Sequence, residues 1–123
     1  MSAIVITRLL PLLIKPLFTT FTETVGGTER LTPVITLTYD DTIITTTVSI
    51  ANAATGETFE WTGDLAPADV LVIDCEDCHV KLNGSAAMLL VDGQFLHLVP
   101  GANVITVSGF SGTCNFTYRA RYV

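Results

Sequence analysis

The feature that most limits the fold of this chain is a series of short alternating segments separated by strong turn signals. Threonine, valine and isoleucine, which favour extended backbone, fill most of these segments. In Ile43–Ile50, for example, Ile44, Val48 and Ile50 share one face, and polar residues dominate the other. Turn dipeptides separate such segments at Asn83-Gly84, Asp92-Gly93 and Pro100-Gly101. No segment has the apolar periodicity of a helix over the ~11 residues that indicate one. We therefore expect an all-β fold, an antiparallel β-sandwich.

The expected strands follow one another at close intervals along the whole chain. They are Ala3–Thr7, Phe18–Val25, Pro33–Tyr39, Ile43–Ile50, Glu57–Thr62, Val70–Cys75, Cys78–Leu82, Met88–Val91, Gln94–Val99, Ala102–Val107 and Thr113–Tyr122. The last one places Cys114, Phe116, Tyr118, Ala120 and Tyr122 on one face. A chain of 123 residues fits one domain.

The N-terminal segment is apolar but does not read as a membrane helix or a secretory signal. Arg8 and Lys15 interrupt it, and Pro11 and Pro16 would break a helix. The uninterrupted apolar stretch is far shorter than the ~20 residues that span a bilayer. We expect an extended N-terminal arm over residues 1–17, a sandwich over residues 18–123, no membrane insertion, and synthesis in the cytoplasm.

Composition narrows the classes of partner. The chain is 49% hydrophobic and only 15% charged, which favours burial of part of its exterior against other proteins or other copies of itself. Its formal net charge of −6 and its six scattered basic residues argue against nucleic-acid binding, which needs clustered Lys and Arg.

The sharpest motif is Cys75-Glu76-Asp77-Cys78-His79. As CxxCH it matches a c-type haem attachment signature, with Met88 or His97 as a second axial ligand, but its place on a hairpin turn argues against haem. A zinc site could be built from Cys75, Cys78 and Cys114, with His79 or His97. The spacing lacks a clear second ligand pair, so we expect neither cofactor.

The cysteines also have a structural interpretation that involves neither haem nor zinc. If Glu76-Asp77 forms a two-residue turn, Cys75 and Cys78 face each other ~5.5 Å apart, within disulfide range. They would then be either packed thiols or a cross-strand disulfide. Cys114 is expected to be a buried core residue.

Other candidate residues have a functional and a packing interpretation. Trp61 could stack on a sugar of a host glycan, with Glu57, Thr58 and Glu60 beside it, or could pack in the core. Acidic turns at Asp40-Asp41, Asp74–Asp77 and Asp92 could bind calcium but more commonly stabilise turns. No nucleophile elbow or other catalytic motif is present, so the sequence predicts no enzyme.

An ordered set of motifs resembles one family. The set comprises Asp69–Asp74, Val80–Gly84, Asp92–Phe95, Leu98–Ile105 and Thr117–Val123, preceded by Val25–Thr28, Pro33–Thr36, Ile50–Asn52 and Thr55–Phe59. Over residues 18–123 it resembles the C-terminal domain of siphophage distal tail proteins, the siphovirus-type tail component family. The resemblance implies a galectin-like β-sandwich (a jelly roll), a virion location in the phage tail, and other tail proteins as partners. The short arm stands where family members usually carry a ring-forming domain, a departure from the family pattern. Two functions stay open: a structural tail or baseplate component that forms a homo-oligomer, or, because the fold resembles galectins, a carbohydrate-binding module.

Overall fold

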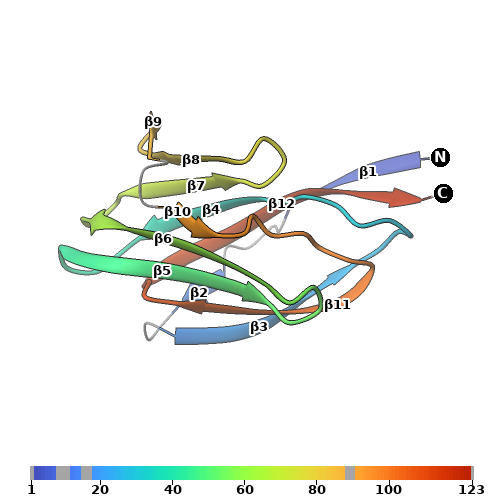
Figure 1. The fold of residues 1–123 in the computed structure, drawn as a ribbon, viewed down its shortest axis with the longest axis horizontal. Coiled ribbons are helices and arrows are strands. Elements are labelled where there is room, and N and C mark those ends of the chain that lie inside the picture. Colours follow the sequence, from blue (N-terminus) through green and yellow to red (C-terminus); the bar gives the residue numbers. More distant parts are fainter. Residues whose placement is uncertain (1, 8–11, 15–17, 88–90, 123) are drawn as a thin grey trace.

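The protein is an antiparallel β-sandwich in a computed structural model. The structure describes residues 2–7, 12–14, 18–87 and 91–122, and side chains within 20–87 and 91–118. One sheet, called sheet A here, has the order β1-β12-β4-β7-β8-β9, with β2 also paired to β12. The other, sheet B, has the order β10-β6-β5-β11-β3. Figure 1 shows the two layers, with both chain ends at the same end of the molecule.

The strands have the following bounds. Sheet A contains β1 (Ser2–Thr7), β2 (Leu12–Ile14), β4 (Val34–Tyr39), β7 (Val70–Asp74), β8 (His79–Leu82), β9 (Ser85–Ala86) and β12 (Gly112–Tyr122). Sheet B contains β3 (Phe18–Val25), β5 (Ile44–Asn52), β6 (Glu57–Leu65), β10 (Val91–Gly93) and β11 (Gly101–Ser108). No helix is found among the described residues, and none of them forms a helix long and apolar enough to cross a membrane. The predicted sandwich is confirmed.

The apolar and polar residues that alternate in the sequence occupy alternately buried and more exposed positions in the strands. In β4 the side chains of Ile35, Leu37 and Tyr39 are buried, and the residues between them are half-exposed. In β5 the predicted inward residues Val48 and Ile50 are fully buried. In β12 Cys114, Phe116 and Tyr118 face the core as the sequence predicts; Ala120 and Tyr122 lie outside the residues whose side chains are described.

Aromatic contacts join the two layers. Phe21 of β3 meets Phe116 of β12 edge-to-face, with ring centroids 5.9 Å apart, so these two strands lie opposite each other across the core. Tyr118 of β12 donates a hydrogen bond from its hydroxyl to Glu23 Oε2 of β3, at 2.8 Å. Beyond β12, the next strands of sheet A are β1 and β2.

Two predicted elements between residues 91 and 100 differ from the structure. Gln94–Val99 was expected to be a strand, but only Leu98 pairs there, in an isolated bridge with Leu31. Asp92-Gly93 was expected to be a turn, but both residues belong to β10 and pair with Glu60 and Phe59. The segment after β10 is held by side chains and by isolated backbone hydrogen bonds, from the Gln94 N–H to the Thr58 carbonyl and between Leu31 and Leu98, rather than by a continuous strand ladder. A local sequence pattern cannot show this. Of the predicted strand Met88–Val91, residues 88–90 lie outside the described residues.

Candidate functional site

The turn between β7 and β8 contains four residues, not two. Asp74 pairs directly with His79, so Cys75 and Cys78 both belong to the turn. Asp74 Oδ1 accepts hydrogen bonds from the backbone N–H groups of Glu76 and Asp77, at 3.0 and 3.1 Å. This carboxylate therefore shapes the turn, as expected for an acidic turn residue. The predicted two-residue turn is wrong, because the carboxylate cap begins one residue earlier.

In this four-residue turn the two cysteines have different environments. Cys75 is 3% exposed, whereas Cys78 is exposed in a left-handed conformation with φ of 56°. Cys78 Sγ lies 3.9 Å from the backbone oxygen of Cys75, to which it donates a weak hydrogen bond. Burial raises the pKa of the Cys75 thiol to about 12, so it stays protonated near neutral pH. The structure contains thiols at both positions, and the Cys75–Cys78 disulfide stays a prediction.

The zinc candidates are not brought together. Cys75 and Cys114 are buried, whereas Cys78 and His79 are exposed. Within the part of the chain that the structure describes, no three His, Cys, Asp or Glu side chains form a group able to hold a metal ion. The second haem-ligand candidate Met88 lies outside the described residues.

Trp61 lies in the core rather than on the surface. Its side chain is 4% exposed, and its Nε1 donates a hydrogen bond to the Ala87 carbonyl at 3.0 Å. Gly63 packs against the indole so closely that an added Cβ would lie 2.5 Å from Trp61 Cη2. These contacts favour the packing interpretation, because a sugar would find neither face of the ring accessible.

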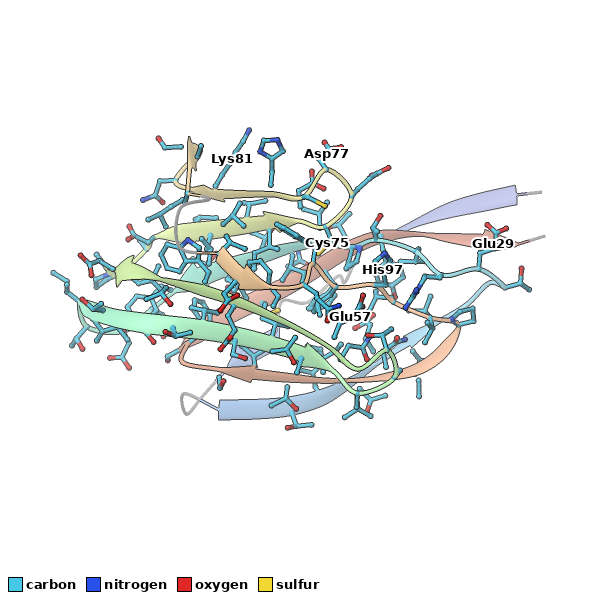
Figure 2. All side chains as sticks on the ribbon, in the orientation of Figure 1. Glu29, Glu57, Cys75, Asp77, Lys81 and His97 are labelled. Atoms are coloured by element: carbon cyan, nitrogen blue, oxygen red, sulfur yellow. The ribbon has the colours of Figure 1, made fainter. Side chains whose placement is uncertain are left out.

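A shallow cavity of about 270 Å³ lies on the outer face of sheet A. Val72 and Asp74 of β7, Asp77 of the turn, and His79 and Lys81 of β8 line it. Alternation along β8 turns His79 and Lys81 outward while Val80 is fully buried. Figure 2 shows Asp77 and Lys81 on this side of the molecule, far from the pair His97 and Glu57. The cavity offers carboxylates that accept hydrogen bonds, an ammonium that donates them, and a small apolar surface.

A polar network fixes the segment between β10 and β11. Glu57 Oε1 accepts the backbone N–H of His97, and Glu57 Oε2 lies 2.8 Å from His97 Nδ1. Burial alone would raise the pKa of Glu57, but the hydrogen bonds from His97 and Thr55 outweigh it and hold this pKa below its ordinary value. Glu57 was predicted only as a neighbour of Trp61, so its partner His97, 40 positions away, was missed.

Two buried asparagines complete this network. Asn52 Nδ2 donates to the His97 carbonyl at 2.9 Å and to Asn103 Oδ1 at 3.1 Å. Asn103 Oδ1 also accepts the Val99 N–H at 2.9 Å, and its Nδ2 donates to the carbonyls of Glu23, Val99 and Gly101. The network holds an irregular segment in place at the end of the sandwich, and its chemistry is structural.

The remaining acidic turns behave as turn stabilisers. Asp41 Oδ1 accepts the backbone N–H of Thr42, and Asp92 Oδ1 accepts that of Gly93, each at 2.8 Å. Such local bonds match the packing interpretation that the sequence favours for these carboxylates.

Comparison with known proteins identifies one family that matches the chain. No curated protein and no solved structure matches the chain. The family model described as siphovirus-type tail component, C-terminal domain, matches residues 26–122, which is well over half of the 123 residues. The match covers every strand of the sandwich from β4 to β12 and confirms the resemblance seen in the sequence. The chain therefore belongs to the siphovirus-type tail component family, as a C-terminal domain of that family.

Proposed function

We propose that this protein is a structural, non-catalytic component of a bacteriophage tail or baseplate that acts by protein–protein assembly. The family match carries the proposal, because it assigns the sandwich to a tail component. Its partners are other tail proteins and further copies of itself, and it reaches the virion after synthesis in the host cytoplasm. The apolar composition supports extensive contact with neighbours.

The N-terminal arm, residues 1–17, is the contact that we expect to matter most. β1 and β2 form an edge of sheet A, so their backbone supplies hydrogen bonds as an added strand does. The family model matches residues 26–122 and does not include the arm. We therefore expect the sandwich to fold without the arm.

Deletion of Met1 to Lys15 tests this role. The truncated protein should keep the circular dichroism of a β-sandwich but fail to join tails in a complementation assay. Ile43→Ser is the matched control, because Ile43 is a large hydrophobic residue, 75% exposed, that lies outside the arm. Normal assembly of the truncated protein, or an equal defect in the Ile43 variant, would refute the role of the arm.

The cavity on sheet A supports a second function, binding of a host carbohydrate. Its mixture of carboxylates, an ammonium and an imidazole suits a ligand rich in hydroxyl groups. Trp61→Ala does not test this idea cleanly, because truncating a buried tryptophan costs about 3–5 kcal/mol of stability. Lys81→Ala is the better variant, since Lys81 is exposed. A glycan array should show binding that this variant loses, and an array without hits would end the idea.

A further inference from the structure

Sheet B ends at β3, and the outer side of this strand has no neighbouring strand among the described residues. There β3 pairs with β11 alone, in an unbroken register from Phe18 opposite Ser108 to Val25 opposite Gly101. Figure 1 shows β3 as the outermost strand of its layer, along the bottom of the view. At the other end of the sheet, β10 is only three residues long. With eight residues, β3 is the longer edge that sheet B offers to another chain.

The free side of β3 presents the backbone groups of three threonines. Along an antiparallel strand, successive residues direct their N–H and C=O groups to alternate sides. The Val104 carbonyl of β11 accepts the Ala53 N–H at 3.0 Å, so Val104 faces the β5 side of its strand and not β3. Thr22 stands opposite Val104, so its own backbone groups face away from β11. The same holds two residues away in each direction, at Thr20 and Thr24.

β3 has little of the protection that edge strands usually carry. It contains no proline, lysine or arginine, and its register with β11 has no bulge. A charge that points inward can also protect an edge, because pairing would bury it. The one charged residue of β3, Glu23, is already only 8% exposed and accepts a hydrogen bond from the Tyr118 hydroxyl. Pairing at this edge therefore adds little desolvation of that carboxylate.

The charges of sheet B favour a second copy as the occupant of this edge. The outward carboxylates of the sheet, Glu60, Asp64 and Asp92, lie on β6 and β10, three and four strands from β3. At the usual strand spacing this is about 14–19 Å, beyond the Debye length of ~8 Å. Two copies, each with a net charge of −6, can thus meet at β3 with these carboxylates far apart. Pairing at β10 would instead bring the two Asp92 side chains together.

Threonine pairs of the kind that this contact needs already occur in sheet B. The hydroxyls of Thr20 and Thr106 lie 3.1 Å apart, and those of Thr47 and Thr62 lie 2.9 Å apart, each pair between adjacent strands. Cross-strand pairs of this type stabilise a sheet. Because a hydroxyl both donates and accepts hydrogen bonds, a row of exposed threonines is complementary to a copy of itself.

We propose that two copies of this chain pair β3 to β3, antiparallel about a twofold axis, and so form one continuous sheet. The inference rests on the proposed function in tail assembly and names the surface through which copies meet. The axis passes Phe21, a register that pairs Phe18–Thr24 of both copies and keeps the two Glu23 carboxylates apart. Thr20 of each copy then lies opposite Thr22 of the other. Phe21 is half-exposed in the single chain, so the contact also buries apolar surface.

Two substitutions at Thr22 test the contact. Thr22→Pro removes an N–H that faces the free edge, and its ring occupies the space of the partner strand, while an edge strand tolerates such a proline. Thr22→Lys instead places a charge at the edge. Thr58→Lys is the matched control, because Thr58 is an exposed threonine on β6, inside the sheet. Circular dichroism checks that each full-length variant is folded.

Sedimentation equilibrium measures the association. The wild-type chain should form a dimer whose share rises with protein concentration. Thr22→Pro and Thr22→Lys should each weaken the dimer by about tenfold or more, and Thr58→Lys by less than about twofold. The proposal is overturned if the wild type stays monomeric at every concentration, if both Thr22 variants dimerise as the wild type does, or if Thr58→Lys is as damaging as Thr22→Lys.

A disulfide tests the register. Thr20→Cys and Thr22→Cys are combined in one chain on Cys78→Ser, which removes the exposed thiol. Opposed residues at hydrogen-bonded positions lie ~5.5 Å apart, so oxidation should link two chains into a dimer on a non-reducing gel. Thr58→Cys with Glu60→Cys, at the same spacing inside the sheet, should give only background dimer, and an equal yield from both would contradict the proposed register.

Failure of this contact and failure of the proposed function give different results. If no dimer forms but deletion of the arm blocks tail assembly, the proposed function survives and the β3 contact is refuted. If the dimer depends on Thr22 but the chain is absent from tails, the β3 contact stands and the tail function is refuted.

Discussion

Asn103→Ala should be the most damaging single truncation of a polar side chain in the sandwich. Asn103 is fully buried and bonds to atoms of β3, β5 and the 94–100 segment. Alanine would leave the Val99 N–H without its acceptor, which costs about 1–3 kcal/mol. Loss of the amide donors that serve three carbonyls adds roughly 1–2 kcal/mol. Asn52 keeps the His97 carbonyl as an acceptor and contributes little.

The expected loss is therefore about 2–5 kcal/mol, a large part of the roughly 5–15 kcal/mol that stabilises a domain. Urea unfolding measures it, with fluorescence of the single tryptophan, buried Trp61, as the signal. Asn115→Ala is the matched control. Asn115 Oδ1 has no hydrogen-bond partner among the described residues, so its removal should cost less than about 1 kcal/mol. Equal effects of the two variants, or a loss under about 1 kcal/mol for Asn103→Ala, would refute the reasoning.

Three further predictions follow from backbone, charge and thiol environments. Gly109→Ala should destabilise the fold by about 1–3 kcal/mol more than Gly56→Ala; both glycines have φ above 70°, but an added Cβ at Gly109 would lie 2.0 Å from the Thr47 carbonyl, whereas the one at Gly56 meets nothing. Equal losses in thermal unfolding would contradict this. Because the folded-state pKa of Glu57 is lowered, its stabilisation is present above the unfolded pKa of about 4.3 and lost as pH falls through the folded value. The stability gap between wild type and Glu57→Gln should therefore shrink from pH 7 to pH 3, and a constant gap would argue against the pairing with His97. Thiol reagents at pH 8 should modify Cys78 in the folded protein and reach Cys75 only on unfolding, since burial raises the Cys75 pKa to about 12; rapid labelling of a folded Cys78→Ser variant would contradict this.

Alternation in the sequence predicts the fold well because burial in a two-layer sandwich repeats every second residue. It places Val48 and Ile50 in the core, as well as Phe116 in the last strand. The same pattern is wrong for Gln94–Val99, where the alternating residues Leu96 and Leu98 are buried although only Leu98 forms a bridge. The alternation of apolar and polar residues predicts which side chains are buried. It does not predict which backbone groups pair, because that depends on residues distant in sequence.

The sequence predicts less of the candidate site than of the fold. His79 and the acidic turn were identified, but Lys81 and Val72 were not, because Lys81 meets Val72 only through the register between β7 and β8. That register follows from the carboxylate cap of Asp74, which lengthens the turn to four residues. The pairing of the arm with β12 joins the two ends of the chain, which no local pattern reveals.

The central claim is that this chain is built into a phage tail, and a reconstruction of purified particles tests it most directly. We predict density for the β-sandwich at the tail or baseplate, in several copies related by the symmetry of the tail. Particles that lack the chain, or that carry it only on the head, would contradict the assignment.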